Sequence, residues 1–185
     1  MDMSTWIIIG IVVVIGLWLM TTYNRLVAGR NQARNAWSQI DVQLKRRHDL
    51  IPSLVEVVKD AMGYEQETLR QVVEARNAAV KASGPAEIGA AEAALSAATT
   101  KLFALMENYP QLKANDNVMQ LQEELTTTEN KISFSRQFYN DSIMGLNNMV
   151  QSFPANLIAG VFGFTVMPHL DIPESERAVP KVKLR

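Results

Sequence analysis

The chain has 185 residues, of which 48% are hydrophobic and 20% are charged, and its formal net charge is −1. This composition supplies enough apolar side chains for a folded core and excludes a chain that is disordered throughout. The absence of cysteine excludes disulfides, thiolate metal sites, a thiol nucleophile and a cysteine-linked lipid anchor.

Residues 6–23 predict a transmembrane helix. Trp6 to Met20 carry no charge, and residues 6–23 in helical form reach roughly 27 Å at about 1.5 Å each, close to a hydrocarbon core of about 30 Å. A cleaved signal peptide is the alternative, but the short flank over residues 1–5 lacks the basic stretch with which such peptides begin. We therefore expect a retained membrane anchor.

Basic residues follow the apolar segment. Arg25, Arg30 and Arg34 lie after it, whereas Asp2 is the one charged residue before it. The positive-inside rule then places the N-terminus outside and the rest of the chain in the cytoplasm. We expect these three arginines to contact anionic lipid headgroups.

The remainder of the chain predicts helices and no sheet, because apolar residues recur at spacings of three and four and never alternate for long. Four helices are expected, at about residues 24–62, 65–82, 85–107 and 115–153. The first can continue from the membrane helix without a break, and the last has a coiled-coil-like repeat. We expect an all-α protein: an N-terminal transmembrane helix followed by an elongated antiparallel four-helix bundle over residues 24–153.

The tail, residues 154–185, contains four prolines and predicts an irregular structure. Its segment from Leu157 to Met167 is apolar but too short to span a membrane. It is expected to lie on the bundle, in the membrane interface or on a neighbouring subunit. The candidate residues for self-association are Leu157, Ile158, Val161, Phe162 and Phe164.

A dense polar group, KRRHD at residues 45–49, interrupts the first soluble helix and is followed by Pro52. His48 falls on the apolar stripe between Leu44 and Ile51. Because Pro52 has no N–H for the carbonyl of His48, we expect another donor to bond that carbonyl and the helix to bend there.

The last helix carries a matching polar run at residues 138–148. If the first and last helices are neighbours, the two polar runs satisfy one another, and buried polar groups that are paired fix the register of the helices. The structural polar belt predicted in this way consists of Asp41, Arg47, His48, Asp49, Pro52, Tyr139, Asn140, Asp141 and Asn147.

Functional interpretations of the first polar group are weaker. Asp41, His48 and Asp49 lack the one-turn spacing of a helical metal site. His48 and Asp49, as adjacent helical residues, face about 100° apart and no nucleophile motif accompanies them. A hydrolase that uses His48 is kept as the enzymatic alternative, but we expect no catalytic residue, no cofactor, no metal and no nucleic-acid partner.

Several segments resemble the LemA family. They are YNRLVAGRNQARNAWSQIDVQLKRRHDLIPSLVEVVK (23–59), ENYPQLKANDNVMQLQEEL (107–125), ENKISFSRQFYNDSIMGLNNMVQSFP (129–154) and ANLIAGVFGF (155–164). The resemblance covers nearly all of the chain up to Phe164. It departs at Val118, where an aromatic residue is usual, and at His169 and Leu170, which replace an aromatic-plus-acid pair.

The resemblance implies one N-terminal membrane helix and a long antiparallel helical bundle, and it brings no catalytic residue to this chain. We expect a non-enzymatic scaffold that self-assembles at the bacterial inner membrane, with membrane lipids and further copies of itself as partners. One alternative, implied by the family's association with membrane metallopeptidases and envelope stress, is an adaptor that presents its bundle to a membrane protease, another envelope protein or a signalling partner. Another alternative is a membrane-shaping protein.

Overall fold

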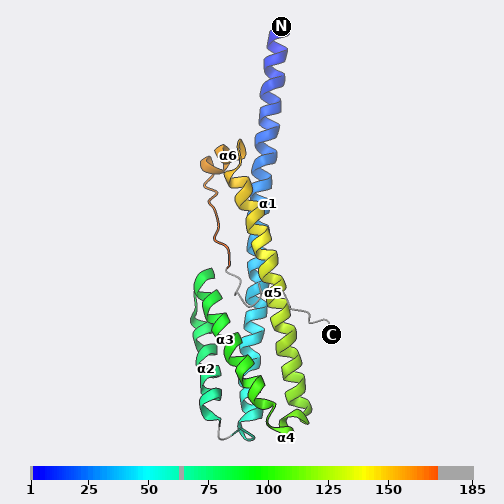
Figure 1. Ribbon diagram of the computed structural model, residues 1–185. Coiled ribbons are helices and arrows are strands. Elements are labelled where there is room, and N and C mark those ends of the chain that lie inside the picture. Colours follow the sequence, from blue (N-terminus) through cyan, green and yellow to red (C-terminus); the bar gives the residue numbers. More distant parts are fainter. Residues whose placement is uncertain (1, 63–64, 171–185) are drawn as a thin grey trace, which may run out of the picture. The chain divides into compact units, whose positions relative to one another are not determined.

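The computed structural model describes residues 2–62 and 65–170, and all regular structure among them is helical (Figure 1). The helices are α1 (Met3–Lys59), α2 (Gln66–Lys81), α3 (Pro85–Met106), α4 (Pro110–Lys113), α5 (Asp116–Gln151) and α6 (Ala155–Val161). Within these residues there is no strand, so the predicted all-α class is confirmed.

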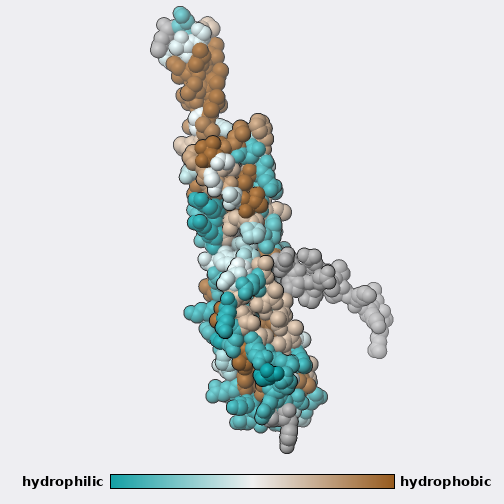
Figure 2. Space-filling model, turned by 90° about the vertical axis from the view of Figure 1, so that its left-hand side faces the viewer, coloured by the Kyte–Doolittle hydropathy of each residue, from teal (hydrophilic) through white to brown (hydrophobic). Residues whose placement is uncertain are grey.

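Helix α1 has 57 residues and runs from the apolar N-terminal segment into the polar part of the chain without a break. Its most apolar 18-residue window has a mean hydropathy of 2.4, and none of that window is buried. Among the described residues, α1 is the one helix that is long and apolar enough to cross a membrane. Figure 2 shows this segment as a hydrophobic, brown surface.

The helix ends follow from local chemistry. Pro85 opens α3, where a proline loses no hydrogen bond, after Gly84 at φ 78°. The side chain of Asn115 caps α5, since its Oδ1 accepts hydrogen bonds from the amides of Asn117 (3.0 Å) and Val118 (3.3 Å).

Two short helices differ from the prediction. Helix α4 lies in the connection before α5, which the sequence predicts only as a break. Helix α6 lies in the tail, which the sequence predicts to be irregular. The prolines of the tail explain this difference, because Pro154 and Pro168 leave a proline-free interval between them in which a helix can form.

The chain divides into two compact units. Among the described residues, unit 1 comprises 2–38 and 137–169, and unit 2 comprises 39–62, 65–136 and 170. Helices α1 and α5 each contribute to both units. The region 24–153, predicted as one bundle, therefore contains two separate packing groups.

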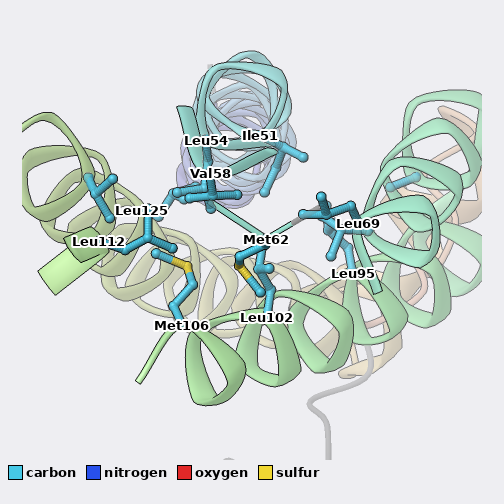
Figure 3. Packing of buried hydrophobic residues seen from close by; sticks show 13 residues of the cluster. Ile51, Leu54, Val58, Met62, Leu69, Leu95, Leu102, Met106, Leu112 and Leu125 are labelled. Carbon is cyan, nitrogen blue, oxygen red and sulfur yellow. The ribbon is translucent and has the colours of Figure 1, made fainter. Parts of the chain in front are cut away.

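Unit 2 has a core to which five helices contribute (Figure 3). Figure 3 shows side chains from α1, α2, α3 and α5 directed toward one another, with Met62 among them. The buried stripe of α1 in this unit passes through Leu44, Arg47, Ile51, Leu54 and Val58. His48, which the sequence places on the apolar stripe between Leu44 and Ile51, is half-buried, and its neighbour Arg47 holds the buried position.

Unit 1 has a smaller core of Leu26, Leu146, Ile158, Ala159 and Phe164. Helix α6 and the segment after it turn back beside α1 and α5, as Figure 1 shows. The amide of Phe164 donates a hydrogen bond to the carbonyl of Ala159 (2.9 Å), which closes the end of α6. Apolar burial on one side of α6 thus holds this part of the tail against the chain's own helices.

Gly29 of α1 lies close to side chains of α5 in unit 1. A Cβ atom added there would lie 2.9 Å from Cε of Met149 and 3.4 Å from Cδ1 of Leu146. We expect Gly29→Ala to be nearly neutral, because the flexible end of Met149 can move and alanine favours a helix by about 1 kcal/mol. Gly29→Leu should lower the free energy of unfolding by about 1–2 kcal/mol through overpacking.

Denaturant titration of the full chain in detergent, followed by circular dichroism, measures both changes. The matched control is Gly145→Leu, because a Cβ at Gly145 meets no atom within 4 Å. Equal losses in Gly29→Leu and Gly145→Leu would show that the close approach has no energetic role.

Candidate functional site

Unit 2 contains a group of polar side chains around a buried arginine and a buried glutamate, which we call the ion cluster: Arg47, His48, Glu92, Ser96 and Glu129. Helix α1 supplies the two basic residues, α3 supplies Glu92 and Ser96, and α5 supplies Glu129. Glu92 is 1% exposed and its Oε2 lies 3.2 Å from Nη1 of Arg47. Its Oε1 lies 2.6 Å from Nε2 of His48. Both carboxylate oxygens of Glu92 are therefore occupied by side chains of α1.

The guanidinium of Arg47 is held from three sides. Besides Glu92, its Nη1 lies 2.7 Å from Oε2 of Glu129, and its Nη2 donates to Oγ of Ser96 (2.8 Å). The hydroxyl of Ser96 in turn donates to Oε1 of Glu129 (2.9 Å). Three helices are thus joined through one buried cation, and each member of the network has a partner.

The pKa of Arg47 is lowered from its ordinary value because burial disfavours the cation, while the carboxylates of Glu129 and Glu92 oppose that shift. The positive charge of Arg136 lowers the pKa further. A guanidinium nevertheless stays protonated in proteins. The two carboxylates therefore balance a permanent positive charge that is largely shielded from water. Removal of one carboxylate would leave that buried charge poorly compensated, which costs free energy of folding.

The geometry gives little support to acid–base chemistry. A groove of about 230 Å³ opens beside the cluster and is lined by Arg47, Ser96 and Glu129, but His48 does not line it. A general base must reach the proton that it removes, and the imidazole instead faces a carboxylate that already holds Arg47. Among residues 2–62 and 65–170, no group of three His, Asp or Glu side chains is arranged to hold a metal ion.

Pro52 leaves one backbone carbonyl of α1 open to a donor from another helix. The carbonyl of His48, which Pro52 leaves without its helical donor, accepts a hydrogen bond from Nε of Arg76 (3.1 Å) on α2. The expectation that another donor would take this carbonyl is confirmed. The proline thereby opens a place on α1 at which α2 is attached.

We expect Arg76→Leu to lower the free energy of unfolding by about 1 kcal/mol, because it leaves this carbonyl without a partner. In a Pro52→Ala background the loss should fall below about 0.5 kcal/mol, since alanine restores the helical N–H to the same carbonyl. Denaturant titration of the four proteins gives the coupling energy. Equal losses in both backgrounds would mean that Arg76 acts through some other contact.

The remaining belt residues of α1 lie elsewhere. Asp41 and Asp49 are exposed and take no part in the ion cluster, and Pro52 itself is exposed. Only Arg47 and His48 of the predicted α1 residues meet in the cluster.

The belt residues of α5 belong to unit 1. Asn147 is buried there, and its Nδ2 donates to the carbonyl of Met167 (2.9 Å) while its Oδ1 accepts from the amide of the same residue (2.9 Å). The ring of Tyr139 packs on Trp37 with ring centroids 5.1 Å apart, and burial raises the pKa of its hydroxyl. Its hydroxyl also donates to the carbonyl of Pro168 (3.4 Å).

Asn140 is half-buried, and Asp141 is exposed. Four members of the predicted belt therefore find partners within their own units. Arg47 and His48 bind carboxylates in unit 2, whereas Tyr139 and Asn147 bind the backbone of the tail in unit 1.

Sequence reasoning did not identify Glu92, Ser96, Glu129 or Arg76. A signal for Glu92 was present, because it lies three residues before Leu95 on a stripe that continues at spacings of three and four. A charged residue at a core position of an otherwise alanine-rich helix indicates a buried partner of opposite charge.

The basic residues after the apolar segment differ from one another. Arg25 and Arg34 are exposed, whereas Arg30 is half-buried, with its guanidinium carbon 4.9 Å from the ring centre of Phe164. This is cation–π geometry. Arg30 thus holds the tail, and the other two arginines face outward.

The candidate self-association residues divide into two groups. Ile158 and Phe164 are buried in the core of unit 1. Leu157, Val161 and Phe162 are exposed. Only the second group is available to a lipid or protein partner.

Comparison with known proteins gives a consistent set of relatives. The sequence profile of the LemA family matches residues 36–184. Protein LemA of Metamycoplasma hominis is 25% identical over 165 residues, which cover 83% of this chain and 74% of that protein.

Two magnetosome proteins are also similar. MamQ 2 of Paramagnetospirillum magneticum and MamQ of Magnetospirillum gryphiswaldense are each 24% identical over 172 residues, with 79% of this chain covered. The match spans 63% of the length of each magnetosome protein.

Proposed function

The chain belongs to the LemA family, and from that premise we propose that it is a non-enzymatic, membrane-anchored scaffold that self-assembles. In this proposal α1, α2, α3 and α5 form an elongated antiparallel four-helix bundle. The N-terminal part of α1 crosses the bacterial inner membrane, with the N-terminus outside and the bundle in the cytoplasm. The main observation in favour of a non-enzymatic role is that both carboxylate oxygens of Glu92 contact side chains of α1, one at Arg47 and the other at His48.

The anchor is supported by the uncovered apolar window of α1. A surface of this kind is unstable in water but stable in a hydrocarbon core. The exposed Arg25 and Arg34 follow it, where anionic headgroups would receive them.

Self-assembly is supported by apolar side chains that unit 2 leaves in contact with solvent. Phe134 on α5 is 73% exposed, and Met119 on the same helix is exposed as well. Exposed apolar side chains on a helix are available for contact with a second copy, and aromatic residues and methionine are enriched in such contacts. The ion cluster would fix the helices of unit 2 in one arrangement, so that every copy of the chain presents the same surface.

Cross-linking through single cysteines tests the proposal, because the chain has none of its own. Phe134→Cys in native membranes should give covalent dimers on mild oxidation. Glu74→Cys on α2, at a residue whose side chain is 60% exposed, is the matched control and should stay monomeric. Monomers from both variants would contradict assembly through α5.

The adaptor alternative predicts a different result from the same membranes. A foreign protein that co-purifies in stoichiometric amount, such as a membrane protease or a signalling protein, would favour an adaptor. A homogeneous assembly of this chain alone would favour the scaffold.

The membrane-shaping alternative is favoured by the exposed apolar residues of α6, such as Val161. The full chain reconstituted in liposomes should change their curvature under this alternative, whereas deletion of residues 154–185 should abolish the change. Round liposomes in both cases would exclude it.

A further inference from the structure

Helix α6 and its flanks expose a set of large apolar side chains, which we call the α6 apolar face: Phe153, Leu157, Val161 and Phe162. Phe153 and Val161 are each 80% exposed, while Ile158 and Ala159 on the opposite side of α6 are buried in unit 1. Residues 142–168 contain no Asp, Glu, Lys or Arg. The segment that carries this face therefore contributes apolar groups and no charged side chain to it.

The α6 apolar face lies beside the end of the proposed membrane anchor. The ring of Tyr23 is 4.8 Å from that of Phe162 and 6.0 Å from that of Phe164, measured between centroids. Tyr23 follows the uncharged stretch Trp6 to Met20 by three residues. Both the face and the anchor belong to unit 1, and Figure 2 shows brown surface both on the N-terminal part of α1 and where it meets the rest of the unit.

We propose that the α6 apolar face lies in the interfacial layer of the same bilayer that α1 crosses and binds phospholipid there. Tyrosine and phenylalanine rings at the end of a span favour the headgroup region. A short helix that immerses one apolar face needs no charged partner and gains free energy from each buried side chain. The chain then contacts the membrane at two places, the span and α6.

This inference rests on the proposed anchor, and it favours lipid over a second copy of the chain as the occupant. The contact of Phe162 with Tyr23 makes the face continuous with the surface that the bilayer covers. A second copy seated on the face would have to displace lipid from beside that anchor.

Spin labels on single cysteines test the inference with the full chain in vesicles of phosphatidylcholine and phosphatidylglycerol. Val161→Cys reports the α6 apolar face, and Val42→Cys, at an exposed valine of unit 2, is the control. Oxygen concentrates in lipid, whereas a nickel chelate stays in water. We expect the ratio of oxygen to nickel accessibility to be several-fold higher at residue 161 than at residue 42. Equal ratios would overturn the inference.

A third label separates this inference from the proposed anchor. Val13→Cys lies in the span and should show the highest ratio of oxygen to nickel accessibility. A water-like signal at both 13 and 161 would refute the anchor, whereas a lipid signal at 13 with a water-like signal at 161 would refute only the role of α6. Spin–spin broadening at 161 that disappears on dilution with unlabelled protein would show a second copy on the face and would also overturn the inference.

Discussion

Replacement of Glu92 by leucine should lower the free energy of unfolding by about 3–5 kcal/mol, because it leaves a buried cation without its most buried partner. Arg47 would keep the hydroxyl of Ser96 and one carboxylate, the partly exposed Glu129, and His48 would lose its carboxylate partner. Denaturant titration of the full chain in detergent measures this loss. The control is Glu123→Leu on α5, where the acid is exposed and the change should stay within about 0.5 kcal/mol.

A second substitution should reverse most of the loss. In Arg47→Met combined with Glu92→Leu, the buried charge and its partner are both replaced by apolar groups of similar volume, which is often neutral or stabilising. We expect the free energy of unfolding of the double variant to lie within about 1 kcal/mol of that of the unchanged protein. A double variant as unstable as Glu92→Leu alone would mean that the cost does not come from an unpaired Arg47.

Asn147→Ala should lower the free energy of unfolding by about 2–3 kcal/mol, since each backbone group that it orphans costs about 1–3 kcal/mol. Both orphaned groups belong to Met167, whose amide and carbonyl are bound by the one side chain of Asn147. The amide of Met167 should therefore exchange with solvent faster, together with the end of the tail.

The matched control is Asn148→Ala, because Asn148 follows directly in the chain and its side chain is exposed. Amide hydrogen exchange read by mass spectrometry distinguishes the two variants. Unchanged exchange at Met167 in Asn147→Ala would show that the tail is held by its apolar contacts alone.

The helices were predictable from the sequence because their apolar spacing is regular over many turns. The predicted start of the second helix at residue 65 is one residue from that of α2, and Pro85 opens α3 as its chemistry requires. The free carbonyl of His48 was predictable for the same reason, since the missing N–H of Pro52 acts within one helix.

The partners in the ion cluster were not predictable in this way. Periodicity shows that a residue such as Glu92 faces a core, but it does not show which helix lies opposite. Periodicity also does not decide which of Arg47 and His48 faces the core. Adjacent residues of a helix point about 100° apart, and the direction of an apolar stripe drifts along a long helix. The acids on α3 and α5 were therefore missed.

The tail was difficult for another reason. The contact of Asn147 with Met167 joins a side chain to irregular backbone, and no repeating pattern in the sequence encodes such a bond. Pro154 and Pro168 dominate the local signal and hide the short apolar helix between them. Which side of α6 is buried and which is exposed follows only from the packing of α6 in unit 1.

The proposed function depends most on the claim that the ion cluster holds helices together and that the chain works by assembling in a membrane. The most direct measurement is the mass of single particles extracted together with native lipid, for the unchanged protein and for the variant with Arg47→Met and Glu92→Leu. We expect the same multi-subunit mass for both proteins. A monomeric mass for the unchanged protein at every concentration would contradict self-assembly, and a loss of assembly in a stable double variant would contradict a purely structural cluster.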